Sequence, residues 1–217
     1  YRVTDALGLT DDGSFPITVT GTNDAPIATY NATSQAVENG STISGTLTAT
    51  DFDSSSTNLV FAAVVDQANP AVAGLTIDAD GDWQFDPDQT AYDDIPKGVT
   101  RNVLVKYSVT DEHQSVGTGE FIIQVAGTND APVATLMSDE SVAEGAVPTL
   151  TGRVLATDAD KPSTVSFALS GTIAGLTLHS DGTWEFNATD PAYNSLAKGV
   201  THDVTVSYVV TDDKTAT

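Results

Sequence analysis

The chain has 217 residues and a net charge of −22 at pH 7, from 30 acidic and 8 basic residues, and it contains no cysteine. This length suits one or two domains, and the lack of cysteine excludes disulfides and thiolate metal sites. The negative charge makes nucleic acid and anionic membranes poor partners. No apolar run approaches the roughly 20 residues of a membrane helix, so we expect neither nucleic-acid binding nor membrane insertion.

The hexapeptide Gly-Thr-Asn-Asp-Ala-Pro occurs twice, at residues 21–26 and 127–132, and marks the start of a repeated unit. Self-similarity at such an interval is typical of tandem repeats. Other segments recur in the same order, namely Tyr1–Asp5 with Tyr107–Asp111 and Tyr208–Asp212, and Asp80–Phe85 with Asp181–Phe186. We therefore predict three parts: the C-terminal strands of a preceding repeat at 1–22, a complete repeat at 23–128, and a second repeat at 129–217 that lacks its last strand.

Within each repeat, apolar residues alternate with polar ones, which is the pattern of half-buried strands. Clear examples are Ile43–Ala49, Val103–Val109 and Val204–Val210, whereas only Tyr92–Lys97 suggests a short helical turn. Turn-forming breaks recur about every ten residues, and about seven short strands per repeat require two sheets packed face to face. We predict an all-β fold of tandem immunoglobulin-like or cadherin-like Greek-key β-sandwiches.

Two aromatic pairs, Trp83 with Phe85 and Trp184 with Phe186, follow matched turns. Residues two positions apart point to the same side of a strand, and large aromatic side chains dominate cores, so we predict that both pairs are buried. The turn Asp78–Asp82 carries three acids at calcium-loop spacing. It lacks the later glutamate of such a loop, and its counterpart has lost two of the acids, so we predict a hairpin turn.

Acidic and amide residues recur at strand ends and in the linkers, which lie at the poles of a sandwich. Carboxylates within about 4 Å repel by about 4 kcal/mol at an effective dielectric near 20, and calcium accepts six to eight oxygen ligands. Asp, Asn and Gly are also ordinary turn residues, but their recurrence in one register favours a metal. The matched sets are Asn23-Asp24 with Asn129-Asp130, Glu38 with Glu144, Asp51 and Asp53 with Asp158 and Asp160, and Asp111 with Asp212.

Four ordered motifs resemble the VCBS and cadherin-like repeats of large bacterial RTX-type surface adhesins: Gly-Thr-Asn-Asp-Ala-Pro, Gly-x-Leu-Thr-x-Thr-Asp-x-Asp, Asp-Gly-x-Trp-x-Phe and Tyr-x-Val-Thr-Asp. The resemblance implies secreted, cell-surface extender modules that calcium (Ca²⁺) rigidifies between domains. It assigns Asn23, Asp24, Asp51, Asp53 and Asp111 to a first junction. It assigns Glu38, Asn129, Asp130, Asp158, Asp160 and Asp212 to a second junction, and Glu144 to a third.

The function that we predict from the sequence is a non-enzymatic spacer that supports cell adhesion and biofilm formation. His113, His179 and His202 occupy unrelated places in the repeats, and no nucleophile elbow or His-Glu-x-x-His motif is present. The alternative is a module that recognises a glycan or a protein. Adjacent repeats of the same chain are the expected partners.

One further expectation concerns self-association. The last repeat lacks a counterpart of Glu120–Val125, whereas Ser14–Thr20 is a copy of that strand without its own sandwich. A sandwich that lacks a strand has an open edge, and a strand from a neighbouring copy could complete it. We therefore expect head-to-tail association by strand complementation.

Overall fold

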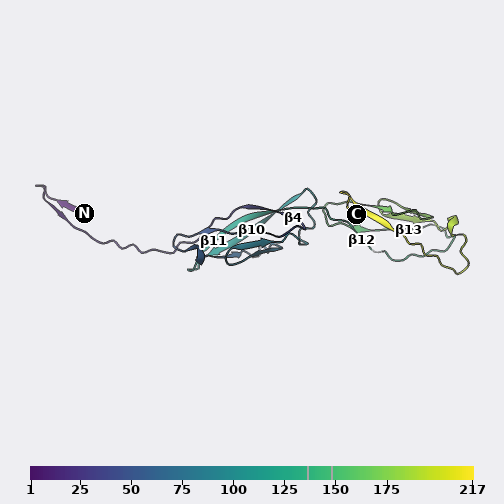
Figure 1. Ribbon diagram of the computed structural model, residues 1–217, viewed down its shortest axis with the longest axis horizontal. Coiled ribbons are helices and arrows are strands. Elements are labelled where there is room, and N and C mark those ends of the chain that lie inside the picture. Colours follow the sequence, from purple (N-terminus) through teal and green to yellow (C-terminus); the bar gives the residue numbers. More distant parts are fainter. Residues whose placement is uncertain (136, 148) are drawn as a thin grey trace.

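The computed structural model describes residues 1–135, 137–147 and 149–217, which form an elongated all-β molecule (Figure 1). An extended N-terminal segment leads into one sandwich, and a second sandwich follows it end to end. Within these ranges the only helical segments are two 3₁₀ turns, η1 (Ser56–Asn58) and η2 (Pro191–Tyr193), and no helix could cross a membrane. The predicted all-β fold is confirmed.

The N-terminal segment begins with a small hairpin of β1 (Arg2–Thr4) and β2 (Thr10–Asp12). Thr4 pairs with Thr10, just as Thr110 pairs with Val116 later in the chain. The hairpin therefore reproduces the tip of a later one, in agreement with the internal repeat. Residues 13–26 form no strand in the structure.

The first sandwich consists of three sheets with the orders β4-β11-β10-β7, β5-β9-β8 and β3-β6. Strands β10 and β11 form a long antiparallel hairpin, and β4 runs parallel to β11 on its other edge. The strands are β3 (Ile27–Ala28), β4 (Thr33–Val37), β5 (Ile43–Thr46), β6 (Ala49–Thr50), β7 (Val60–Ala63), β8 (Leu75–Ile77), β9 (Asp82–Phe85), β10 (Thr100–Thr110) and β11 (Val116–Ala126).

The core of the first sandwich is built around Phe121 on β11. Its ring lies 5.1 Å from the ring of Trp83 and 5.2 Å from that of Tyr30, centroid to centroid. The Tyr107 hydroxyl donates a 2.8 Å hydrogen bond to the carbonyl oxygen of Tyr30, so the one polar atom of that ring is satisfied inside the core. Trp83 and Phe85 are 1% and 0% exposed, which confirms their predicted burial.

The acidic turn at Asp78–Asp82 joins β8 to β9 as a hairpin turn, as the sequence predicts. One Asp78 carboxylate oxygen accepts the backbone N–H groups of Asp80 and Asp82 at 3.1 and 2.9 Å. Gly81 has φ +91°, a conformation that favours glycine. The Asp78 carboxylate therefore serves the turn itself, whereas the Asp82 carboxylate accepts the Thr46 hydroxyl at 2.6 Å.

The second sandwich has the sheets β13-β17-β16, β15-β18 and β12-β14. Its strands are β12 (Val133–Ala134), β13 (Leu150–Arg153), β14 (Ala156–Thr157), β15 (Val165–Leu169), β16 (Leu176–Leu178), β17 (Thr183–Phe186) and β18 (Tyr208–Asp212). Residues 201–207 form no strand, so the predicted strand at Val204–Val210 is wrong over its first half. The physical reason is that no strand of the described chain pairs with residues 201–207, whereas β11 pairs with the corresponding part of β10 in the first sandwich.

The core of the second sandwich is correspondingly less closed. Trp184 packs against the core of the second sandwich, which confirms its predicted place there, but both Trp184 and Phe186 are only half-buried. In the first sandwich Phe121 covers Trp83, and the described part of the second sandwich supplies no counterpart of that ring. The aromatic pair is on the core face, but one side of it stays open.

Replacing Phe121 by Ala should lower the free energy of unfolding of the first sandwich by about 3 to 5 kcal/mol, because a buried aromatic ring is lost and a cavity remains. The control is Phe52→Ala, since Phe52 is 83% exposed; it should change stability by less than about 0.5 kcal/mol. Urea unfolding followed by tryptophan fluorescence measures both. Equal effects of the two substitutions would contradict the central role of Phe121.

Candidate functional site

The second hexapeptide is packed against the end of the first sandwich. The Gly127 N–H donates to the Val99 carbonyl at 2.9 Å. A Cβ on Gly127 would lie 2.0 Å from the Ile95 carbonyl oxygen, so only glycine fits. The first hexapeptide differs, because a Cβ on Gly21 would meet nothing within 4 Å. The glycine of the hexapeptide is therefore packed against the first sandwich at Gly127, whereas the identical glycine at Gly21 has no such contact.

Glu38 binds Thr128, the linker residue that follows Gly127. Its side chain is buried, and one carboxylate oxygen accepts the Thr128 N–H at 2.7 Å. The Glu38 N–H donates to the Ala126 carbonyl at 2.9 Å. The carboxylate lies beyond the end of β4, the strand that runs beside β11, so the β4–β11 pairing places Glu38 at the linker.

Side chains of the second sandwich hold the remainder of the linker. The Asn129 amide donates to an Asp212 carboxylate oxygen at 2.7 Å, and the Asp130 N–H donates to Asp160 at 3.1 Å. The Asp160 N–H in turn donates to Asp158 at 2.9 Å. Carboxylates from both sandwiches therefore converge on residues 128–130, and we call Glu38, Asn129, Asp130, Asp158, Asp160 and Asp212 the second cluster.

Several oxygens of the second cluster are buried without a hydrogen-bond partner. Such atoms are rare in proteins, and each costs free energy unless water or an ion satisfies it. They are Oε1 of Glu38, Oδ1 of Asn129, Oδ2 of Asp130, Oδ2 of Asp158 and Oδ1 of Asp160. Carboxylate and amide oxygens are the donors that calcium prefers, so the donor set fits such a cation.

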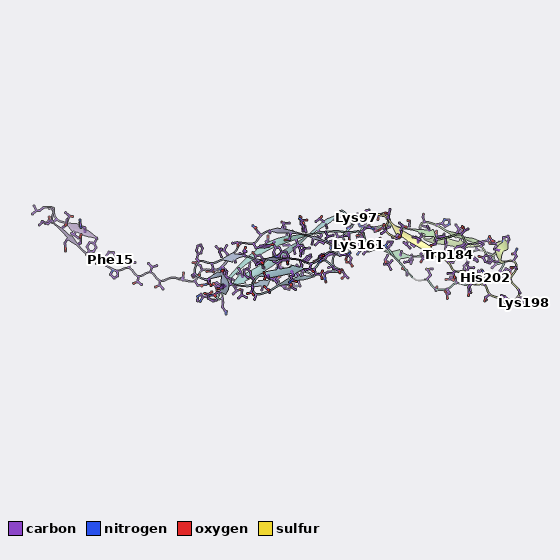
Figure 2. All side chains as sticks on the ribbon, viewed as in Figure 1. Phe15, Lys97, Lys161, Trp184, Lys198 and His202 are labelled. Carbon is purple, nitrogen blue, oxygen red and sulfur yellow. The ribbon has the colours of Figure 1, made fainter. Side chains whose placement is uncertain are left out.

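No basic side chain forms an ion pair with this cluster in the part of the chain that the structure describes, although the charges of Asp213, Asp212 and Asp160 raise the pKa of Lys214. Lys97 and Lys161 lie near the boundary of the two sandwiches (Figure 2), but neither forms an ion pair there. The ion pairs within residues 1–135, 137–147 and 149–217 involve Asp12, Asp94 and Asp213, none of which belongs to the second cluster. Within these residues, no acid of the second cluster therefore has an ion-pair partner of its own.

Burial and mutual repulsion disfavour ionisation at this junction. Burial raises the pKa of Glu38, and the charges of Asp130 and Asp160 add to the increase, although the Thr128 N–H opposes it. Burial likewise raises the pKa of Asp130 and of Asp160. Each group is harder to ionise in the folded chain than in the unfolded one.

One further acid, Asp93, was not anticipated from the sequence. Its charge contributes to the raised pKa of Asp130. The residue follows the buried Tyr92 in the loop whose Ile95 contacts Gly127. Its counterpart in the second repeat is Asn194, so a search for acids that recur in both repeats could not identify Asp93.

The first predicted junction brings together its own five residues. The Asn23 amide donates to Asp111 at 2.8 Å, the Asp24 N–H donates to Asp53 at 3.1 Å, and the Asp53 N–H donates to Asp51 at 3.0 Å. One oxygen of Asp51 is buried without a partner. Asn23 and Asp24 are exposed, unlike Asn129 and Asp130, because no described residue covers them as Glu38 covers the second linker.

Glu144 stands apart from both clusters. It is exposed, and the neighbouring Gly145 N–H donates to the Ala188 carbonyl at 2.9 Å. Across the described chain, no group of three or more His, Asp or Glu side chains has the spacing of a formed metal site. The clusters are assembled through hydrogen bonds to backbone and amide groups, with their remaining oxygens unpaired.

Residues 23–124 match the family model described as Bacterial Ig domain. The solved structure of Drosophila N-cadherin EC1-4 is similar over 80% of this chain and 43% of that chain, at 19% identity and a TM-score of 0.50. The human desmocollin-1 ectodomain matches 90% of this chain and 35% of its own, at 14% identity and a TM-score of 0.49. No curated protein matches the sequence.

This chain thus spans less than half the length of those two structures. At such identities the similarity shows the fold alone: an immunoglobulin-like β-sandwich of the kind found in cadherin repeats.

The two identical hexapeptides provide a matched test of the linker. Gly127→Ala places a methyl group against the Ile95 carbonyl and should lower the free energy of unfolding by about 1 to 3 kcal/mol, as overpacking does. Gly21→Ala should stay within about 0.5 kcal/mol. Differential scanning calorimetry of both variants measures this, and an unchanged Gly127→Ala protein would argue against a packed linker.

Proposed function

We propose that this chain is a non-enzymatic extender segment of a large secreted bacterial adhesin, in which calcium at the junctions stiffens a row of sandwiches. The observation that carries the proposal is the second cluster, where unpaired buried oxygens from both sandwiches converge on residues 128–130 and no acid of the cluster forms an ion pair in the described chain. The sequence resemblance to VCBS-type repeats, the match to a bacterial immunoglobulin-like domain and the elongated shape support it.

The calcium ligands would come from the residues that each junction brings together. Asn23, Asp24, Asp51, Asp53 and Asp111 would serve the first junction, the six residues of the second cluster would serve the second, and Glu144 would serve a third. Asp93 is an added candidate at the second junction because of its effect on Asp130. A bound divalent cation would supply positive charge to acids that have no ion-pair partner in the described chain.

Calcium binding at such a site would make the stiffness of the chain depend on the calcium concentration around it. Extracellular calcium modules bind at about 0.1 to 1 mM, and an ion present at ten times its dissociation constant adds about 1.4 kcal/mol to the folded state. That contribution vanishes where calcium is scarce, as before export. A chain of these repeats would then become a stiff stalk at the cell surface, and its role would be to extend an adhesin in support of cell adhesion and biofilm formation.

A second candidate function, recognition of a glycan or a protein, is favoured by one observation. The segment between Phe61 and Gly74 is five residues longer than its counterpart between Phe167 and Gly175. It borders a groove of about 380 Å³ with apolar lining, which includes Val65, Val72 and Leu104. Binding to a glycan or peptide array that persists in variants without the junction acids would favour this function.

Calcium titration followed by calorimetry tests the junction model. The unfolding temperature should rise with calcium, and Asp160→Asn should abolish the rise of the transition that includes the second junction. Asp80→Asn is the matched control, since Asp80 belongs to a hairpin turn and its N–H, not its carboxylate, makes the turn contact. It should leave the calcium response intact, and an equal loss in both variants would contradict the assignment.

In chelator, Asp160→Asn should instead stabilise the protein at neutral pH. An aspartate whose pKa is raised on folding costs no stability below its unfolded pKa of about 3.9, and the cost appears as pH rises through the folded pKa. The advantage of the variant should therefore grow from about pH 4 towards pH 7. Urea unfolding across this range measures it, and an advantage that instead grew towards low pH would contradict the sign.

Small-angle X-ray scattering tests the mechanical role. Calcium should increase the maximum dimension of the chain relative to chelator, because neutralised junction acids hold the two sandwiches in one orientation. Asp80→Asn should behave like the unmodified chain, and Asp160→Asn should show little change on calcium addition. An equal maximum dimension with calcium and with chelator would exclude the stiffening role, even if calcium binds.

A further inference from the structure

The first sandwich has an open stretch of sheet edge on β10. β7 pairs only with residues 107–110 of that strand, and the Val64 N–H donates to the Lys106 carbonyl at 2.9 Å just after β7 ends. Residues 100–105 of β10 therefore have β11 on one side and no strand of the described chain on the other. An unpaired edge of this kind is a template for a further strand.

The backbone groups at this edge belong to alternate residues. The hydrogen bond from the Gly127 N–H to the Val99 carbonyl continues the ladder between β10 and β11, so the odd-numbered residues of β10 bond to β11 and the even-numbered ones face the β7 side. Asn102 and Leu104 thus turn their N–H and C=O groups to the open edge, where they form no hydrogen bond with the described chain. The two residues are about 7 Å apart along the strand.

A groove of about 380 Å³ runs along the open edge. Four consecutive residues of β10, 103–106, line it. Since consecutive side chains of a strand point to opposite faces, all four can line one groove only if it lies at the edge of the strand. Residues 63–65 and 68–73 also line the groove, together with Leu75, Ala91 and Tyr92. Its volume is in the range of ligand sites, roughly 300 to 1,000 Å³.

An insertion in the first sandwich provides part of this lining. In the second sandwich the strand equivalent to β7 ends in the same way, with the Ser170 N–H donating to the Ser207 carbonyl at 2.9 Å. The first sandwich then has five more residues before the next matched glycine, Gly74. This longer segment includes Val65, which lines the groove and is 60% exposed. The strand pairing does not require the insertion, because the second sandwich forms it without one.

We propose that this groove binds an extended segment of another protein, which adds a strand beside residues 100–105 of β10. Backbone groups of the segment would pair with Asn102 and Leu104, and every second side chain would contact the apolar lining, as in strand addition generally. A glycan has no N–H and C=O groups at the spacing of a strand. The inference rests on the second candidate function above, for which it names the partner, and it does not depend on calcium at the junctions.

Charge complementarity makes a basic segment the best partner. Among the described residues that line the groove, Lys106 is the only charged one. An acid follows the lining residues at each end of the groove, Asp66 after residue 65 and Asp93 after residue 92, and neither forms an ion pair in the described chain. Arg101 is already paired with Asp94. The net charge of −22 also attracts a basic segment and repels a second copy of this chain.

Two capped peptides test the proposal by calorimetric titration of the full chain. Lys-Thr-Val-Thr-Val-Thr-Lys should bind, and Glu-Thr-Val-Thr-Val-Thr-Glu should bind at least about tenfold more weakly, because its ends are repelled. The titrations are done in chelator, so that the result is independent of the junction model. Cellohexaose should not compete with the lysine peptide. No binding of that peptide at about 1 mM, equal binding of both peptides, or competition by cellohexaose would overturn the proposal.

A matched pair of variants tests the place of binding. Val65→Lys puts a like charge into the apolar lining and should weaken binding of the lysine peptide by at least about tenfold. Val60→Lys is the control with the same charge change, since Val60 is 51% exposed and does not line the groove; it should leave binding unchanged. Equal effects of the two variants would overturn the assignment of the groove.

Hydrogen exchange tests the mode of binding. The lysine peptide should slow exchange of the Asn102 and Leu104 N–H groups by at least about tenfold, because each gains a hydrogen-bond partner in the added strand. A peptide that binds without protecting these two groups would overturn the strand-addition mode.

Discussion

The linker between the sandwiches is short, and this constraint governs the rest of the junction. Glu38 binds the N–H of Thr128, whereas Asp212 and Asp160 bind the next two residues. Because side chains of both sandwiches bind three consecutive linker residues, the facing ends of the two sandwiches must lie close together. Because those ends carry carboxylates, the geometry that joins the domains also concentrates negative charge, and the resulting repulsion and burial are the physical basis of the cation site proposed above.

The two junctions show how the same residues behave with and without a covering domain. At the second junction Asn129 and Asp130 are partly buried, whereas the identical Asn23 and Asp24 are exposed. The hydrogen bonds within each set are alike. Local sequence therefore sets the arrangement of the acids, and the neighbouring sandwich adds the burial.

The two sandwiches also differ in how closely their cores are packed. Trp83 is closed in by Phe121 and Tyr30, and the first sandwich has a continuous core. Trp184 occupies the same position in the second repeat but remains half-buried, because a core position needs its partners as well as its own side chain. This dependence explains why the alternation at Val204–Val206 did not become a strand.

The sequence by itself determined the all-β architecture, the repeat and the hairpin at Asp78–Asp82, and it showed that acids recur at strand ends and in the linkers. These features follow from local rules: a two-residue period, turn chemistry and recurrence at a fixed interval. Only the tertiary structure decided that Glu38 is buried against Thr128, that the charge of Asp93 acts on the pKa of Asp130 and that Trp184 is left partly open. Side-chain burial, unpaired buried oxygens and strand pairing all depend on contacts between residues far apart in the chain. An alternating pattern predicts the face of the strand on which a side chain lies, but it does not predict which residues cover that side chain.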